Sequence, residues 1–109
     1  MITVTSEHDG ITLYDISDGD ARGQGVGLIL PGAGNEILQL RCARGVMFCS
    51  AFSPEGLARC HFPAAIFAAP KFEDMMERTP RFLSDEALAL GATMEMTGRE
   101  LLHVFAGTK

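Results

Sequence analysis

The feature that most constrains the fold is the apolar stretch of residues 45–52, Gly-Val-Met-Phe-Cys-Ser-Ala-Phe, which leads into Ser53-Pro54-Glu55. The apolar run is typical of a buried strand. Serine is a favoured N-cap, proline suits the first helical position, and glutamate complements the positive end of the helix dipole. We therefore predict a central strand that runs directly into a short helix ending at about Arg59.

The length and composition indicate one globular domain. The chain has 109 residues, with 47% hydrophobic and 21% charged side chains. This length suits a single domain with one core, and this balance argues against disorder. We therefore treat residues 1–109 as one unit.

Charge and cysteine content exclude several function classes. The net charge is -5, and the few basic residues form no cationic stripe, so we expect no nucleic acid partner. No apolar run approaches the ~20 residues of a membrane helix, so we expect no membrane. Three cysteines without paired spacing favour reduced thiols and a cytoplasmic location.

The N-terminal half is rich in strand patterns. Apolar residues recur with period two or nearly so in segments 2–5, 11–16, 24–30 and 37–42, with turn residues between them. The last of these segments and the central strand are separated by Ala43-Arg44-Gly45, which suits a hairpin with a bulge. This half therefore predicts a series of strands, the last of which forms a hairpin with the central strand.

The C-terminal half mixes strands with short helices. The apolar run 62–69 suits a strand covered on both faces. Helices are expected to begin near Phe72, Ser84 and Thr97, the last with a Thr-Gly-Arg-Glu capping box. Residues 92–96 are expected to form a short strand. The sequence thus predicts an α+β fold with a mixed sheet and short helices packed mainly on one face.

Two glycine clusters, residues 23–27 and 32–34, carry no nucleotide-binding signature. Neither is a G-x-G-x-x-G that opens a helix, and no G-K-[ST] is present. We expect these glycines to serve turns and bulges, and we expect no cofactor.

Three stretches together resemble the YunC-like family, a group of small bacterial and archaeal domains of unknown function. They are Gly-Val-Met-Phe-Cys at 45–49, the alanine-rich strand and acidic helix at 64–76, and the helix end and cap at 87–101. The likeness covers about residues 24–105. Ser50 stands where the family pattern has glycine. The resemblance implies a compact, oligomeric α+β domain and implies no reaction.

Cys49 is the first candidate for chemistry. With a hairpin loop at 43–45, Leu40 would face Phe48 and Gln39 would face Cys49. Cys49 would then share a polar face with Arg41, whose guanidinium would favour the reactive thiolate. The opposing interpretation is that Cys49 is a small apolar filler of the core, as most buried cysteines are. A register shift of one residue would exchange the two faces.

A thiol enzyme also needs a base, and His61 is the candidate from the middle of the chain. A metal site is not expected, because the spacings among Cys42, Cys49, Cys60 and His61 match no standard zinc pattern. Four residues are candidates for ligand binding, and Arg99 is among them because it lies at a helix N-terminus that could hold an anion. These four are Arg41, Ser50, Lys71 and Arg99.

Two functional hypotheses follow. The first is a small non-catalytic domain that self-associates and acts as an accessory or small-ligand-binding module, because no complete catalytic constellation is present and Met and Phe suit an interface. The alternative is a small thiol-dependent enzyme that uses Cys49 with His61.

Overall fold

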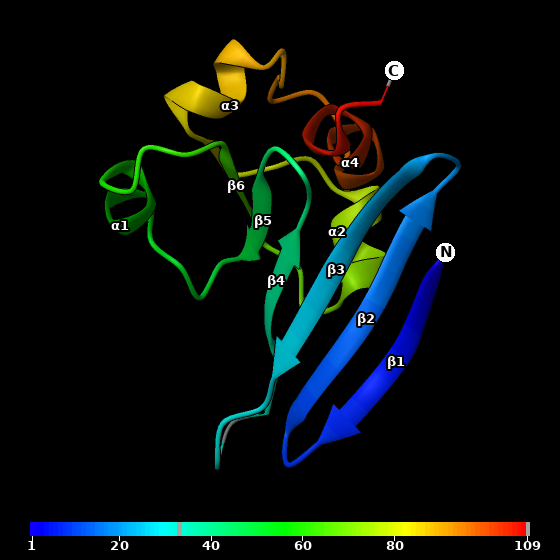
Figure 1. Ribbon diagram of the computed structural model, residues 1–109. Helices are drawn as coiled ribbons and strands as arrows, with labels where there is room; N and C mark the ends of the chain where they lie inside the picture. The colour runs from blue at the N-terminus through cyan, green and yellow to red at the C-terminus, as the bar shows by residue number, and fades with distance from the viewer. Residues whose placement is uncertain (33, 109) are drawn as a thin grey trace.

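The computed structural model describes residues 1–32 and 34–108. Within them, seven strands form one sheet and lie side by side in chain order (Figure 1). The strands are β1 (Ile2–His8), β2 (Ile11–Asp18), β3 (Ala21–Leu28), β4 (Ile37–Arg41), β5 (Val46–Cys49), β6 (Ala64–Phe67) and β7 (Phe82–Leu83). All neighbouring pairs are antiparallel except β5 and β6, which are parallel. The sheet is mixed, which confirms the predicted α+β fold.

The helices of the described residues are α1 (Pro54–Ala58), α2 (Phe72–Glu77), α3 (Asp85–Ala89) and α4 (Gly98–Ala106). Helices α1, α3 and α4 begin at the predicted capping residues, and α2 begins at Phe72 without a side-chain cap. The Ser53 hydroxyl accepts a hydrogen bond from the Gly56 N–H at 3.1 Å, so α1 starts at the expected N-cap. None of the helices in residues 1–32 and 34–108 has the length and apolar character needed to cross a membrane.

The main core lies between the sheet and the pair α2 and α4. Leu40, Met47 and Phe67 of the sheet are fully buried in one cluster with Phe72 of α2 and Phe105 of α4. Burial of a large apolar side chain stabilises the fold by about 1.5–3 kcal/mol. The helices therefore pack mainly on one face of the sheet, which we call the helix face.

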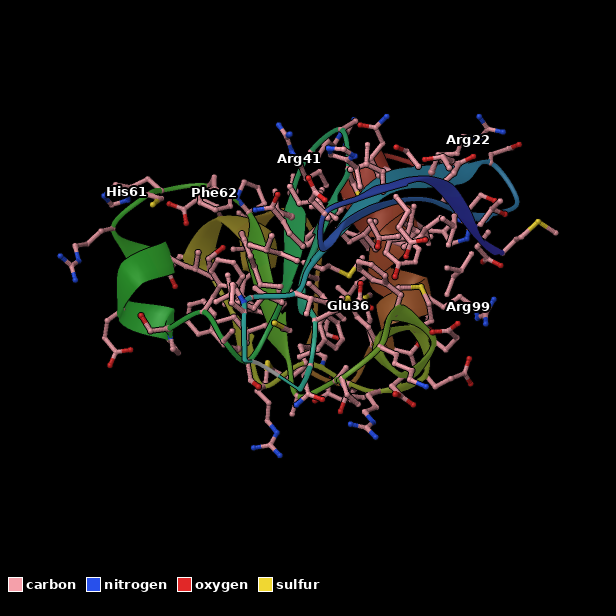
Figure 2. All side chains as sticks on the ribbon, turned by 90° about the horizontal axis from the view of Figure 1, so that it is seen from below. Arg22, Glu36, Arg41, His61, Phe62 and Arg99 are labelled. Atoms are coloured by element: carbon pink, nitrogen blue, oxygen red, sulfur yellow. The ribbon has the colours of Figure 1, made fainter. Side chains whose placement is uncertain are left out.

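A smaller cluster covers part of the opposite face. Phe48 of β5 and Ile66 of β6 pack there against Leu57 of α1. Helix α1 is the crossover between these two parallel strands, so β6 is covered on both faces, as its apolar run predicts. Along β1 to β4, this second face carries no helix in the described part of the chain (Figure 2).

The first glycine cluster does not form a turn. Gly23, Gly25 and Gly27 lie within β3 and are buried on the helix face. A Cβ at Gly25 would lie 2.9 Å from the ring of Phe72, so the absence of a side chain lets α2 approach the sheet. The turn and bulge role expected of the glycines at 23–27 was therefore wrong, whereas the strand expected at 24–30 is present as part of β3. Gly32, with φ of +82°, does lie in a turn.

The strand expected at 92–96 is absent from the described residues. This segment is irregular and contains one turn, closed by a hydrogen bond from the Met96 N–H to the Thr93 carbonyl at 3.2 Å. The edge strand is instead β7, only two residues long, which pairs with β6. A strand this short shows no periodicity, so the sequence pattern did not reveal it.

The hairpin of β4 and β5 is shifted by one residue from the predicted register. Gln39 pairs with Phe48, and Leu40 pairs with Met47. The turn is closed by the Cys42 N–H, which donates to the Gly45 carbonyl at 2.9 Å. Because side chains alternate along a strand, this shift moves Cys49 onto the helix face. The prediction that Cys49 and Arg41 share a face was therefore wrong.

Candidate functional site

A cavity of about 400 Å³ lies at the carboxyl ends of β5 and β6. Because these strands are parallel, the loops that follow them leave the sheet at the same edge. The segment before β4 closes the third side of the cavity. Its lining residues are Asn35, Glu36, Ile37, Cys49, Ser50, Ala51, Ala68, Ala69 and Pro70. We call this space the β5–β6 cavity.

Two of the predicted site residues, Cys49 and Ser50, meet at this cavity. Cys49 is only 5% exposed, and its Sγ accepts a hydrogen bond from the Leu38 N–H at 3.2 Å. Ser50 is exposed at the mouth. The sulfur is thus part of the wall, and Ser50 is an exposed residue of the lining.

Glu36 brings a carboxylate to the same cavity, and the sequence pattern did not single it out. The Tyr14 hydroxyl donates to its two carboxylate oxygens at 3.1 and 3.0 Å. Burial and then the Glu36 hydrogen bond and charge raise the pKa of Tyr14 to about 12. A Cβ at Gly27 would lie 2.0 Å from Glu36 Oε2. Glycine within β3 therefore makes room for this pair.

The other proposed helpers of Cys49 lie elsewhere. The His61 side chain is 79% exposed, and its Nδ1 lies 3.6 Å from Glu86 Oε2. Figure 2 shows His61 and Arg99 at opposite ends of the molecule, with Arg41 between them at the surface. Lys71 is exposed just before α2, next to the cavity residue Pro70. Among the described residues, no hydrogen bond joins Cys49 to a base.

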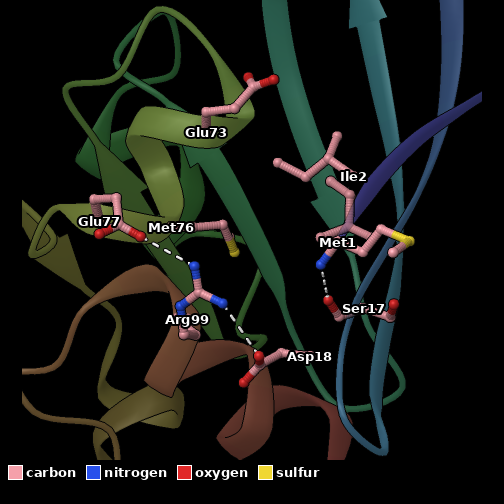
Figure 3. A pocket seen from close by; sticks show the side chains of 9 residues that line it. Met1, Ile2, Ser17, Asp18, Glu73, Met76, Glu77 and Arg99 are labelled. Atoms are coloured by element: carbon pink, nitrogen blue, oxygen red, sulfur yellow. Dashed lines mark hydrogen bonds and ion pairs between the residues drawn. The ribbon is translucent and has the colours of Figure 1, made fainter.

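Arg99 borders a second cavity of about 380 Å³ between β2, α2 and α4 (Figure 3). Its guanidinium lies 3.1 Å from Asp18 Oδ1 and 3.0 Å from Glu77 Oε2. The N-terminal amine of Met1 donates to the Ser17 carbonyl at the same cavity. Binding of an anion by Arg99 stays a prediction, and it would require these two carboxylates to be displaced.

Asp18 also ties β2 to the last helix. The His103 Nε2 lies 2.7 Å from Asp18 Oδ2. This hydrogen bond, with a further contribution from Arg99, lowers the pKa of Asp18. The expected capping box is present, with the Thr97 N–H donating to Glu100 Oε1 at 3.0 Å. The contacts around Arg99 and Asp18 therefore hold α4 against the sheet.

Comparison with known proteins informs the fold alone. No family model matches the sequence, and no curated protein is significantly similar. A solved structure, a protein of unknown function, TA1206, from Thermoplasma acidophilum, superposes with a TM-score of 0.78 at 16% sequence identity. The match covers 92% of this chain and 99% of the other. The chain thus shares its α+β fold with this archaeal protein, while its resemblance to the YunC-like family stays a prediction.

Proposed function

We propose that the chain is a non-catalytic domain that binds a small polar molecule in the β5–β6 cavity. The observation that carries the proposal is the convergence of the loops after two parallel strands on one hollow. In sheets with parallel strands, ligands bind in the crevice outside the carboxyl ends of those strands. The cavity volume of about 400 Å³ also lies within the range of about 300–1,000 Å³ found for ligand sites.

The lining suggests the chemistry of the ligand. Glu36 is an acceptor, Ser50 offers a hydroxyl, and Asn35 offers an amide that both donates and accepts. Ile37 and Ala69 supply apolar wall. A small molecule that carries an amine or a hydroxyl next to a short apolar portion would satisfy this set. No cationic side chain lines the cavity among the described residues, which disfavours a multiply charged anion.

The geometry of Cys49 supports binding rather than thiol catalysis. Its sulfur is buried and accepts a backbone hydrogen bond, whereas a thiol nucleophile needs access to substrate and a neighbouring base. His61 lies outside the cavity lining, and Arg41 lies on the opposite face of the sheet. The thiol enzyme would need His61 to move to Cys49.

A thermal-shift screen tests the binding site. A set of small amines, amino alcohols and amides is expected to include members that raise the melting temperature of the wild-type chain. Ser50→Trp places a large ring at the exposed mouth and should abolish these increases. Ala89→Trp, at an exposed position on α3, is the matched control and should retain them. No stabilisation by any compound, or equal stabilisation of both variants, would overturn the proposal.

We further propose that the chain is a YunC-like, self-associating domain of the cytoplasm. Two of the three stretches that carry the family resemblance, 45–49 and 64–76, contribute Cys49 and Ala68 to Pro70 to the β5–β6 cavity. The unpaired cysteines support a reducing compartment. Apolar side chains left exposed on the sheet support self-association.

A further inference from the structure

The face of β1 to β4 opposite α2 and α4, which we call the open face, is apolar at one end. Ile11 and Leu13 are 44% and 42% exposed. Across the strands, Ile11 lies beside Leu28 and Leu13 lies beside Val26, so these four side chains share the open face. Ile37 is next in this row on β4, where it is partly buried because it also packs against the main core and lines the β5–β6 cavity. A contiguous apolar patch of this kind marks an interaction surface.

The other end of the open face carries opposite charges in one row. Asp15 of β2, Gln24 of β3 and Arg41 of β4 are direct neighbours across the strands. Neither Asp15 nor Arg41 forms an ion pair within residues 1–32 and 34–108. The two charges therefore lie on the strands that flank β3, and neither has an ion-pair partner within the described residues.

We propose that a second copy of this chain packs on the open face about a two-fold axis that runs along β3. The inference rests on the self-association proposed above and adds its surface and symmetry. Such an axis exchanges β2 with β4, so Asp15 of each copy meets Arg41 of the other. The same operation places Ile11 against Ile37 and Leu13 against Gln39, and it places Val26, Leu28 and Arg22 of β3 against their own equivalents. A two-fold interface requires this self-complementarity.

The dimensions of the open face limit the size of such an interface. Strands β2 and β3 have eight residues each. Under an axis along β3, the strands of the two open faces that overlap are β2, β3 and β4, and β4 has five residues. With a rise of about 3.3 Å per residue and about 4.8 Å between strands, these three strands cover roughly 330 Å² before side-chain relief is counted. The interface is therefore smaller than the standard of about 800 Å² of accessible surface per partner. Arg22 lies at the rim, where Figure 2 shows it at the surface. Because Arg22 is exposed at this end of β3, its long side chain can turn outward so that the two guanidinium groups stay in water.

Reversal of the charges at positions 15 and 41 tests the proposed two-fold interface. Light scattering after size exclusion should give a dimer for the wild-type chain. Asp15→Arg and Arg41→Asp should each weaken the dimer by about tenfold or more, because each places like charges opposite one another. The double variant, which exchanges the two charges, should restore wild-type association. Glu95→Arg, an exposed charge reversal away from this face, is the control and should leave the dimer unchanged.

The outcomes separate the inference from the proposed self-association. A wild-type chain that stays monomeric at every accessible concentration overturns both. A wild-type dimer that neither single variant weakens shows that the chain self-associates through another surface, and it overturns this inference alone. Two weakened single variants that are not rescued in the double variant overturn the pairing of Asp15 with Arg41 and hence the axis along β3.

Discussion

At the scale of single residues, Tyr14 reports on the β5–β6 cavity through its hydrogen bonds to the lining residue Glu36. It is the only tyrosine of a chain without tryptophan, so its ionisation can be followed by ultraviolet absorbance. Glu36→Gln removes a hydrogen-bonded charge but leaves the burial, which is the larger cause. The pKa of Tyr14 should therefore fall from about 12 but stay above its usual value of 10.0. Glu73→Gln, a weaker influence, should lower it less.

The sign of the linked stability effect follows from that pKa. The folded state disfavours the Tyr14 phenolate. The contribution of neutral Tyr14 to the stability of the fold is therefore fully present below its unfolded pKa near 10, and it is lost as pH rises toward its folded pKa of about 12. Urea unfolding of the wild-type chain should show a fall in the free energy of unfolding over this alkaline range, and the Glu36→Gln variant should show a smaller fall. A Tyr14 titration unchanged by Glu36→Gln would contradict the hydrogen-bonded pair.

The three cysteines should differ sharply in reactivity. Cys60 is exposed, Cys42 is partly buried, and Cys49 is buried. Burial raises the pKa of the Cys42 thiol to about 12, and the thiolate is the form that reacts. Iodoacetamide at pH 8 should label Cys60 first, and Cys42 and Cys49 mainly after unfolding, as peptide mass spectrometry would show. Labelling of Cys49 as fast as Cys60 in the folded chain would favour the thiol enzyme instead.

The register of the β4–β5 hairpin determined which single-residue predictions were correct. The sequence located the strand that holds Cys49, but not the face on which its side chain lies. Whether the turn is closed at residue 42 or 43 depends on one hydrogen bond, from the Cys42 N–H to the Gly45 carbonyl. No local propensity distinguishes the two closures. Glu36 was missed for a related reason, because its partners Tyr14 and Gly27 come from other strands.

At the scale of elements, Ser84 does more than cap a helix. It is 2% exposed, accepts hydrogen bonds from the Ala64 and Ala87 N–H groups, and donates to the Phe62 carbonyl. Ser84→Ala should therefore destabilise the fold by about 2–4 kcal/mol, since it leaves buried donors unpaired as well as removing a cap.

The exposed N-cap Ser53 is the matched comparison. It makes one capping bond, to the Gly56 N–H, so Ser53→Ala should cost about 1 kcal/mol. Both values come from urea unfolding monitored by circular dichroism. If Ser53→Ala lowered the free energy of unfolding as much as Ser84→Ala or more, the result would contradict the role assigned to the Ser84 hydroxyl.

Helix starts were the elements most open to prediction, because their signals are local. The caps at Ser53, Ser84 and Thr97 each satisfy backbone donors of the residues that follow them. The edge strand β7 was not predictable in this way. It is held by the backbone of β6, where the Ser84 N–H donates to the Ala64 carbonyl at 2.9 Å. That partner lies 20 residues earlier in the chain.

At the scale of the whole molecule, the sequence predicts the fold class but only part of the site. Strands that follow one another along the chain are also neighbours in the sheet, so local patterns were enough to indicate a mixed sheet with helices mainly on one face. The β5–β6 cavity is different, because segments 35–37, 49–51 and 68–70 meet only after β5 and β6 pair in parallel. Cys49 and Ser50 could be anticipated, and Asn35 and Glu36 could not.

The proposed ligand site lies at the loops that follow β5 and β6. Two-dimensional ¹H–¹⁵N NMR of the labelled chain, titrated with the small amines, amino alcohols and amides, tests it most directly. Binding in the β5–β6 cavity should give shift changes that are concentrated at residues 35–37, 49–51 and 68–69 and that saturate with a single affinity. Changes confined to the open face or to the cavity beside Arg99, or no saturable change at all, would contradict it.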